Sequence, residues 1–160
     1  MNPATDVDSA DRPDIIIFDK PFAFSDAEEP YRSVSIVEFK RPERDDYPQD
    51  ASKKNPIAQV GEYADKLRDG TALDRHGNTM NVGKNVPVYA YIICDLTPSL
   101  RKIARLSQLT STPDNDGYFG FHREYEVYME IMSYKKLLGD AKRRNEKFFD
   151  ELGIGRSCTP

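Results

Sequence analysis

Three short segments in the first hundred residues have the composition of β-strands. The segment "PDIIIF" (13–18) contains three consecutive isoleucines, and "SVSIVEFK" (33–40) is rich in β-branched apolar residues, which favour extended structure. The segment "VPVYAYIICD" (86–95) is almost wholly apolar, which is typical of a central strand buried on both faces of its sheet. Further along, 118–124 and 125–134 alternate in a way that predicts an antiparallel pair of strands.

Helical spacing of apolar residues predicts three helices. The first follows Asn55, which can cap a helix, and Pro56, which suits the first helical position. Its apolar stripe consists of Ile57, Val60, Ala64 and Leu67. A second helix is expected over 99–106 and a third over 134–152, where Ser133 is a suitable cap.

The order of these elements predicts an α/β fold with a mixed sheet. The second strand, the first helix and the third strand form a βαβ unit, so those two strands should run parallel. The first two strands are close enough in sequence to form an antiparallel hairpin. We expect a three-layered domain over 12–153 with helices flanking the sheet, a disordered leader over 1–11 and a tail over 154–160.

Composition and charge narrow the class of protein. Charged residues make up 31% of the chain and no apolar run reaches the ~18 residues of a membrane span, so we expect a cytoplasmic protein without a membrane partner. The net charge is −4, but 51–160 contain 17 basic and 14 acidic residues. A polyanion would therefore meet this second part of the chain. Two isolated cysteines, Cys94 and Cys158, do not suggest a disulfide framework.

Two charged residues stand at the end of the second predicted strand. Glu38 and Lys40 are two positions apart, so their side chains share one face. The hairpin register places Asp14 opposite Glu38 and puts Asp19 at the far end, ~16 Å away at the usual rise per residue. The sequence therefore predicts a cluster of Asp14, Glu38 and Lys40 at one end of the sheet.

Two carboxylates beside a lysine suit a hard divalent cation. Mg²⁺ is usually held by one or two carboxylates together with water and phosphate oxygens, and Mn²⁺ can take its place. A neighbouring lysine can orient water or stabilise charge on a phosphoryl group. A salt bridge at a strand end is the structural alternative, and the Glu38–Lys40 spacing alone favours it.

The pattern Pro13-Asp14 followed by Glu38-Phe39-Lys40 resembles the PD-(D/E)xK, or restriction-endonuclease-like, nuclease superfamily. Gln59 and Tyr63 on the following helix look like the QxxxY motif of its exonuclease-like branch. The resemblance implies that Asp14, Glu38 and the Phe39 main-chain carbonyl bind Mg²⁺ or Mn²⁺. It also implies that Lys40 is catalytic and that Gln59 and Tyr63 position the lysine, metal-bound water or a substrate phosphate.

A second resemblance covers roughly 12–153. The segments "VEFKRP", "NPIAQV", "YAYIICDLTPSL", "GYFGFH" and "KKLLGDAKRRNEKFFDELG" look like a nuclease-like C-terminal domain of bacterial histidine-kinase/Hsp90-type ATPase proteins. It implies that an ATPase domain of a parent protein is a partner. The sequence departs from the superfamily pattern, because the helix and strand that usually come before the first motif are not predicted ahead of Pro13.

Other residues have simpler interpretations. Basic residues over 135–147 could contact a phosphate backbone, but they also suit the solvent-exposed face of an amphipathic helix whose other face joins the core. We expect the aromatic residues of 118–134 to be core residues, and Asp95 to cap the following helix. His76 and His122 have no partners at metal-ligand spacing, and we expect both to be structural.

Two functions remain in competition. The first is metal-dependent hydrolysis of nucleic-acid phosphodiester bonds, with DNA as the expected substrate. The alternative is a non-catalytic module that docks nucleic acid or protein within a larger ATPase-containing protein.

Overall fold

The computed structural model describes residues 12–19, 31–50, 54–74 and 76–153. The predicted leader over 1–11, most of the connection between the first two strands and the tail over 154–160 lie outside the described residues.

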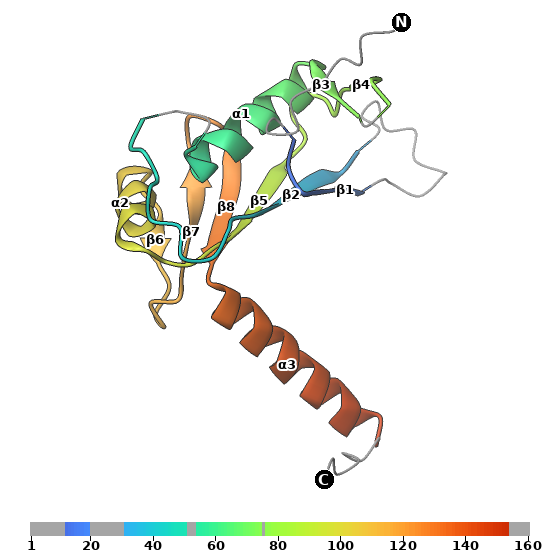
Figure 1. Ribbon diagram of the computed structural model, residues 1–160. Helices are drawn as coiled ribbons and strands as arrows, with labels where there is room; N and C mark the ends of the chain where they lie inside the picture. The colour runs from blue at the N-terminus through green and yellow to red at the C-terminus, as the bar shows by residue number, and fades with distance from the viewer. Residues whose placement is uncertain (1–11, 20–30, 51–53, 75, 154–160) are drawn as a thin grey trace, which may run out of the picture.

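A mixed six-stranded sheet forms the framework (Figure 1). In spatial order its strands are β1 (Ile15–Asp19), β2 (Ser33–Phe39), β5 (Val88–Ile93), β8 (Val127–Met132), β7 (Gly117–His122) and β6 (Thr110–Ser111). β2, β5 and β8 run parallel, whereas the pairs β1–β2, β7–β8 and β6–β7 are antiparallel. The predictions that the third strand is central, that it runs parallel to the second, and that the sheet is mixed are confirmed. A separate hairpin pairs β3 (Ala72–Leu73) with β4 (Thr79–Met80).

Helix α1 (Pro56–Arg68) begins as the sequence predicts. The side-chain oxygen Oδ1 of Asn55 accepts hydrogen bonds from the Ile57 and Ala58 amides at 3.0 and 3.4 Å, which satisfies two of the donors left unpaired at a helix start. The side-chain amide of Asn55 donates in turn to the carbonyls of Pro48 and Asp50. The cap therefore fixes both the helix and the loop that leads to it.

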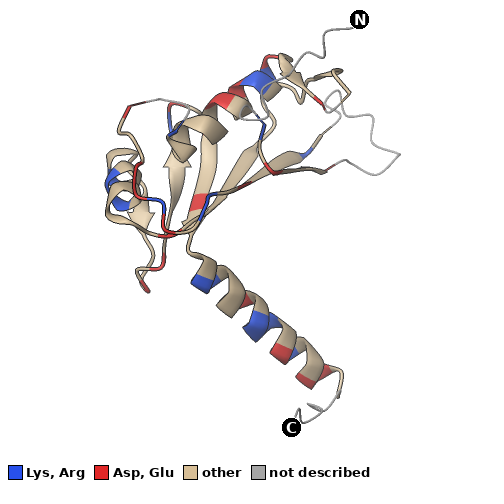
Figure 2. Ribbon diagram, viewed as in Figure 1, with Lys and Arg blue, Asp and Glu red and all other residues tan. Residues whose placement is uncertain are grey.

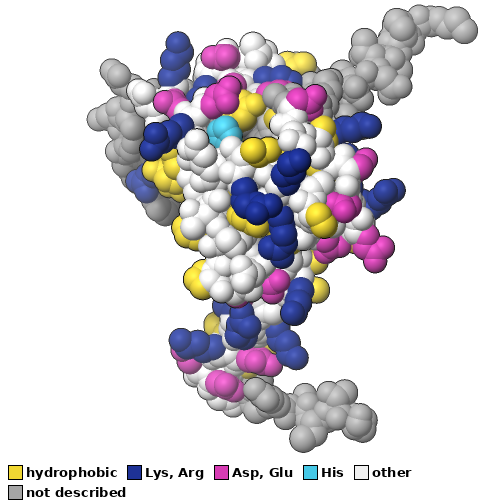
Figure 3. Space-filling model, turned by 90° about the vertical axis from the view of Figure 1, so that its left-hand side faces the viewer, with side chains coloured by type: hydrophobic (Ala, Val, Ile, Leu, Met, Phe, Trp, Pro, Cys, Tyr) yellow, Lys and Arg dark blue, Asp and Glu magenta, His cyan; other side chains and the backbone are white. Residues whose placement is uncertain are grey.

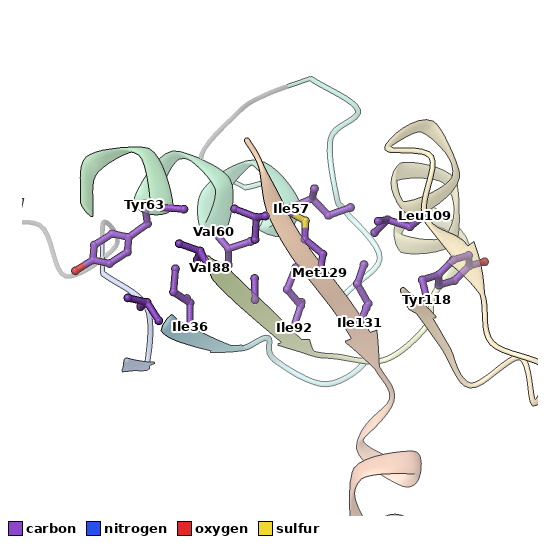
Figure 4. Close-up of a cluster of buried hydrophobic side chains, with 14 of the residues drawn as sticks. Ile36, Ile57, Val60, Tyr63, Val88, Ile92, Leu109, Tyr118, Met129 and Ile131 are labelled. Carbon is purple, nitrogen blue, oxygen red and sulfur yellow. The ribbon is translucent and has the colours of Figure 1, made fainter. Parts of the chain in front are cut away.

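The hydrophobic core lies between one face of the sheet and two helices. Helix α1 and helix α2 (Pro98–Leu106) contribute Ile57, Val60 and Ile103 to the same buried cluster as Ile36 of β2 and Ile131 of β8. Figure 4 shows α1 lying over this face, with its side chains pointing at those of the strands. Every second residue of β2 is buried, as expected when one face of a sheet is covered.

The opposite face of the sheet has no helix over it among the described residues. Tyr89 and Tyr91 of β5 are partly exposed, so the prediction of a strand buried on both faces is wrong. Phe119, Phe121 and Tyr128 are exposed, so only part of the predicted aromatic core forms. The described chain has two layers rather than the predicted three, because the third helix does not return to the sheet.

Helix α3 (Tyr134–Glu151) projects away from the domain (Figure 1). Its start agrees with the sequence, since the Ser133 hydroxyl accepts a hydrogen bond from the Lys136 amide at 2.9 Å. No residue of α3 is buried, and Leu138 and Phe148 are 68% and 57% exposed. The prediction that its apolar face joins the core is therefore wrong.

No helix in the described ranges is long and apolar enough to cross a membrane.

Candidate functional site

The β1–β2 hairpin brings Asp14 to Glu38. Ile15 pairs with Val37, so Asp14 stands at the next register position, and Asp19 pairs with Ser33 at the other end. The Asp14 carboxylate accepts a hydrogen bond from the Phe39 amide at 2.7 Å. The predicted register is confirmed, and it separates Asp14 from Asp19 by the length of β1.

Lys40 lies in a buried ion pair. Its ammonium group donates to the Glu38 carboxylate at 2.6 Å and to the Gln59 side-chain oxygen at 2.5 Å. Glu38 is 5% exposed and Lys40 is 9% exposed. Lys40 at a strand end would ordinarily extend into solvent, but α1 lies over this end of the sheet and Gln59 reaches down to it. The pair is therefore much better shielded from water than a strand-end salt bridge.

Burial dominates the electrostatics of Glu38. Desolvation raises the pKa of this carboxyl, while the hydrogen bond and charge of Lys40 lower it and the Asp14 carboxylate raises it again. The second Glu38 oxygen, Oε2, is buried and makes no hydrogen bond to the described residues. A buried carboxylate oxygen without a partner is costly, so this atom is a good candidate for a ligand to a cation.

The two residues of the QxxxY pattern have different surroundings. Gln59 joins the site through Lys40. Tyr63 belongs to the hydrophobic core, and its buried hydroxyl makes no hydrogen bond within the described ranges. Burial raises the pKa of Tyr63, which keeps it neutral. The structure thus brings Gln59 to Lys40, but it does not hydrogen-bond Tyr63 to Lys40 or Glu38.

Tyr134 is a member of the site that the sequence did not indicate. Its hydroxyl donates a hydrogen bond to the main-chain carbonyl of Lys40 at 2.6 Å. The two residues are 94 positions apart, and they meet because β2, β5 and β8 are parallel and end at the same edge of the sheet. The first residue of α3 therefore supports the backbone that carries Lys40.

Asp95 has a different role from the one predicted. Its carboxylate accepts a hydrogen bond from the Glu43 amide at 2.7 Å and so holds the loop after β2. The amide of Ser99, at the start of α2, donates instead to Asp45 at 2.8 Å. The helix cap is thus supplied from a loop that is distant in sequence, which local spacing cannot reveal.

The side chains at this strand end suit Mg²⁺ better than a metal ion whose ligands all come from the protein. No group of three or more histidine, cysteine, aspartate or glutamate side chains suited to a metal occurs in the part of the chain that is described. Asp14 and Glu38 are two carboxylates at one strand end, and Oε2 of Glu38 has no other partner. Mg²⁺ needs no more than one or two protein carboxylates because water and substrate complete its shell. The residues present therefore fit the ion that the resemblance implies.

Basic side chains gather on the side of the molecule where α2 lies (Figure 3). Lys102 and Arg105 of α2 are exposed, whereas Arg101 donates to the Leu96 and Asn115 carbonyls. Helix α3 carries basic and acidic residues mixed along its length (Figure 2). The positive surface is thus local, which suits contact with a short stretch of polyanion better than an extended track.

Comparison of the chain with family models, with curated proteins and with solved structures found no match.

Proposed function

We propose that this chain is a metal-dependent nuclease domain of the PD-(D/E)xK type, which hydrolyses phosphodiester bonds in nucleic acid, with DNA as the expected substrate. One observation carries the proposal. Lys40 is held between Glu38 and Gln59, and an unpartnered Glu38 oxygen and the Asp14 carboxylate lie at the same strand end. A purely structural ion pair needs neither the second acid nor the orphaned oxygen.

Each protein group has a definite task in this proposal. Asp14 and Glu38 would hold Mg²⁺, with the Phe39 carbonyl as a further ligand. When bound, the ion would stabilise negative charge on the phosphate and lower the pKa of a coordinated water. Lys40 would orient the attacking water or stabilise charge on the phosphate oxygens. Gln59 would fix the lysine, and the Tyr134 hydroxyl would fix the backbone beneath it.

We expect Mg²⁺ to raise the melting temperature of the wild-type chain. At ten times the dissociation constant, binding adds about 1.4 kcal/mol, which corresponds to roughly 3–6 °C. Asp14→Asn should abolish this shift because it removes a charged ligand, yet the amide oxygen can still accept the Phe39 hydrogen bond. Differential scanning fluorimetry with and without Mg²⁺ makes the measurement.

Asp19→Asn is the matched control, since it makes the same change at an exposed position on the same strand. Its metal-induced shift should equal that of the wild type. Equal shifts in both variants would remove Asp14 from the metal site.

Cleavage of DNA tests the activity itself. We expect Mg²⁺- or Mn²⁺-dependent cleavage by the wild type, and a loss of about 10²–10³ in rate in Lys40→Ala if the ammonium stabilises the transition state. Because Lys40 is buried, the variant must be assayed below its own melting temperature, with the folded fraction measured by circular dichroism. Wild-type cleavage by Lys40→Ala would exclude the lysine from the mechanism. An absence of both metal binding and cleavage in the wild type would favour the docking-module alternative.

A further inference from the structure

Two apolar surfaces of this chain lack a partner among the described residues. The first, called here the open face, is the side of the sheet opposite α1. Its exposed apolar side chains are Ile15, Ile17, Phe39, Phe119, Phe121 and Tyr128. The rings of Tyr89 and Phe121 lie 5.3 and 4.8 Å from that of Tyr128. The register connects the two sides of this face. Ile17 lies beside Ser35, Ser35 beside Tyr89, and Tyr89 beside Tyr128.

The second surface is the apolar stripe of α3. Leu138, Phe148 and Phe149, with Leu152 at the helix end, are all exposed. Phe148 and Phe149 come four and three residues before Leu152, and Leu138 comes 11 residues, or about three helical turns, before Phe149. The four side chains therefore share one helix face. An amphipathic helix of this kind normally gains its stability by packing that face against another element. In Figure 1 the helix extends well beyond the sheet, so its far half touches no other described element.

We propose that α3 packs on the open face of a second copy of this chain, and that the exchange is reciprocal. The two surfaces are complementary in charge as well as in polarity. Asp19 and Glu130 are acidic residues on the open-face side of β1 and β8, whereas Lys142 and Arg144 border the apolar stripe of α3 at helical spacing. The proposal does not depend on the nuclease function.

The dimensions of the two surfaces agree. An 18-residue helix is ~27 Å long, and six strands spaced ~4.8 Å apart span ~24 Å. An aromatic side chain can bury about 150–250 Å², and five aromatic residues of the two surfaces are about half exposed. Two reciprocal contacts would therefore remove roughly 1,000 Å² before the aliphatic residues are counted, which reaches the size of a specific interface.

The start of α3 argues against return of the helix to its own sheet. Ser133 alone separates β8 from α3, and it caps the helix. Tyr134 is hydrogen-bonded to the carbonyl of Lys40. Folding α3 back over its own open face would pull Tyr134 away from Lys40, whereas packing on a second copy keeps this contact.

The test is the oligomeric state of the full chain, measured by size-exclusion chromatography with multi-angle light scattering over a range of concentrations. We expect a wild-type dimer. Phe149→Glu in α3 and Tyr128→Lys on the open face should each weaken it about 10³-fold. Loss of one central interface residue commonly raises the dissociation constant about 30-fold. Each substitution occurs twice in the dimer, so the two losses multiply to about 10³-fold. The positions are exposed, so circular dichroism should show an intact fold.

Control variants distinguish a contact between α3 and the open face from other modes of association. Lys147→Glu, on the polar side of α3, and Tyr128→Phe should both remain dimeric. A wild-type monomer at all concentrations would overturn the proposal, including the case in which α3 folds back within one chain. A dimer that Phe149→Glu dissociates but Tyr128→Lys does not would also overturn it, because such a dimer would be held by α3 alone.

Discussion

Lys40→Met is expected to lower the free energy of unfolding at neutral pH by about 3–5 kcal/mol, the range measured when one partner of a buried ion pair is removed. Methionine fills a similar volume, so packing changes little. The loss comes from the Glu38 carboxylate, which stays buried beside Asp14 without the ammonium group that now hydrogen-bonds to it. Equilibrium unfolding in urea provides the measurement.

The effect should depend on pH and on Glu38. Without Lys40 the pKa of Glu38 rises further, because burial and Asp14 already raise it and the lysine opposes them. The folded state then binds a proton more tightly than the unfolded state does, so stability falls as pH increases from the unfolded pKa through the folded one. Lys40→Met should therefore be least destabilised near pH 4.

A double variant provides the control. Lys40→Met combined with Glu38→Gln should recover most of the loss at neutral pH and should lack this pH dependence. A loss that is independent of pH and that persists in the double variant would mean that packing, rather than charge, is responsible.

Gly61→Ala is expected to destabilise the protein by about 1–3 kcal/mol through overpacking. Gly61 is buried in α1, and a Cβ atom there would lie 2.2 Å from the ring of Tyr125. The backbone that carries this ring is fixed to α1, because Arg68 donates to the Tyr125 and Glu126 carbonyls, both at 2.7 Å, and the ring itself packs 4.9 Å from that of His122. The gain of up to ~1 kcal/mol that alanine brings to a helix interior is too small to offset the clash.

Gly139→Ala makes the same change in α3, but its effect on the stability of the protein should have the opposite sign. The nearest atom to a Cβ at Gly139 is Nη1 of Arg143 at 3.9 Å, an ordinary contact. Only helix propensity remains, so stability should increase or stay unchanged. Thermal unfolding of both variants makes the comparison, and equal effects would show that the Tyr125 contact does not control the outcome at Gly61.

Local sequence patterns were sufficient to predict most helices and strands and part of the candidate site. The Asn55-Pro56 start signal predicts the first turn of α1, and the chain length between β1 and β2 fixes the register that pairs Asp14 with Glu38. The βαβ order makes β5 parallel to β2. These features depend on neighbouring residues or on the handedness of one connection, so they can be derived without knowledge of the rest of the fold.

The features that could not be predicted depend on distant parts of the chain. An amphipathic pattern in α3 shows that one face is apolar, but it does not say what covers that face. The apolar run of β5 suits a strand buried on either one or two faces. The burial of Lys40 depends on where α1 crosses the sheet, and the Tyr134 contact depends on β2 and β8 ending at the same edge.

The parallel centre of the sheet also sets an order of events during synthesis. β5 pairs with β2 on one side and with β8 on the other, and both pairings are parallel. The β5–β8 pairing must wait until the ribosome has made residues 127–132, so a nascent chain that ends before them exposes one edge of its most apolar strand. Distant pairings of this kind form slowly, and an unpaired apolar edge promotes aggregation. Chains truncated within β8 should therefore accumulate as inclusion bodies, and an intact β8 is the minimum requirement for a chain that stays in solution.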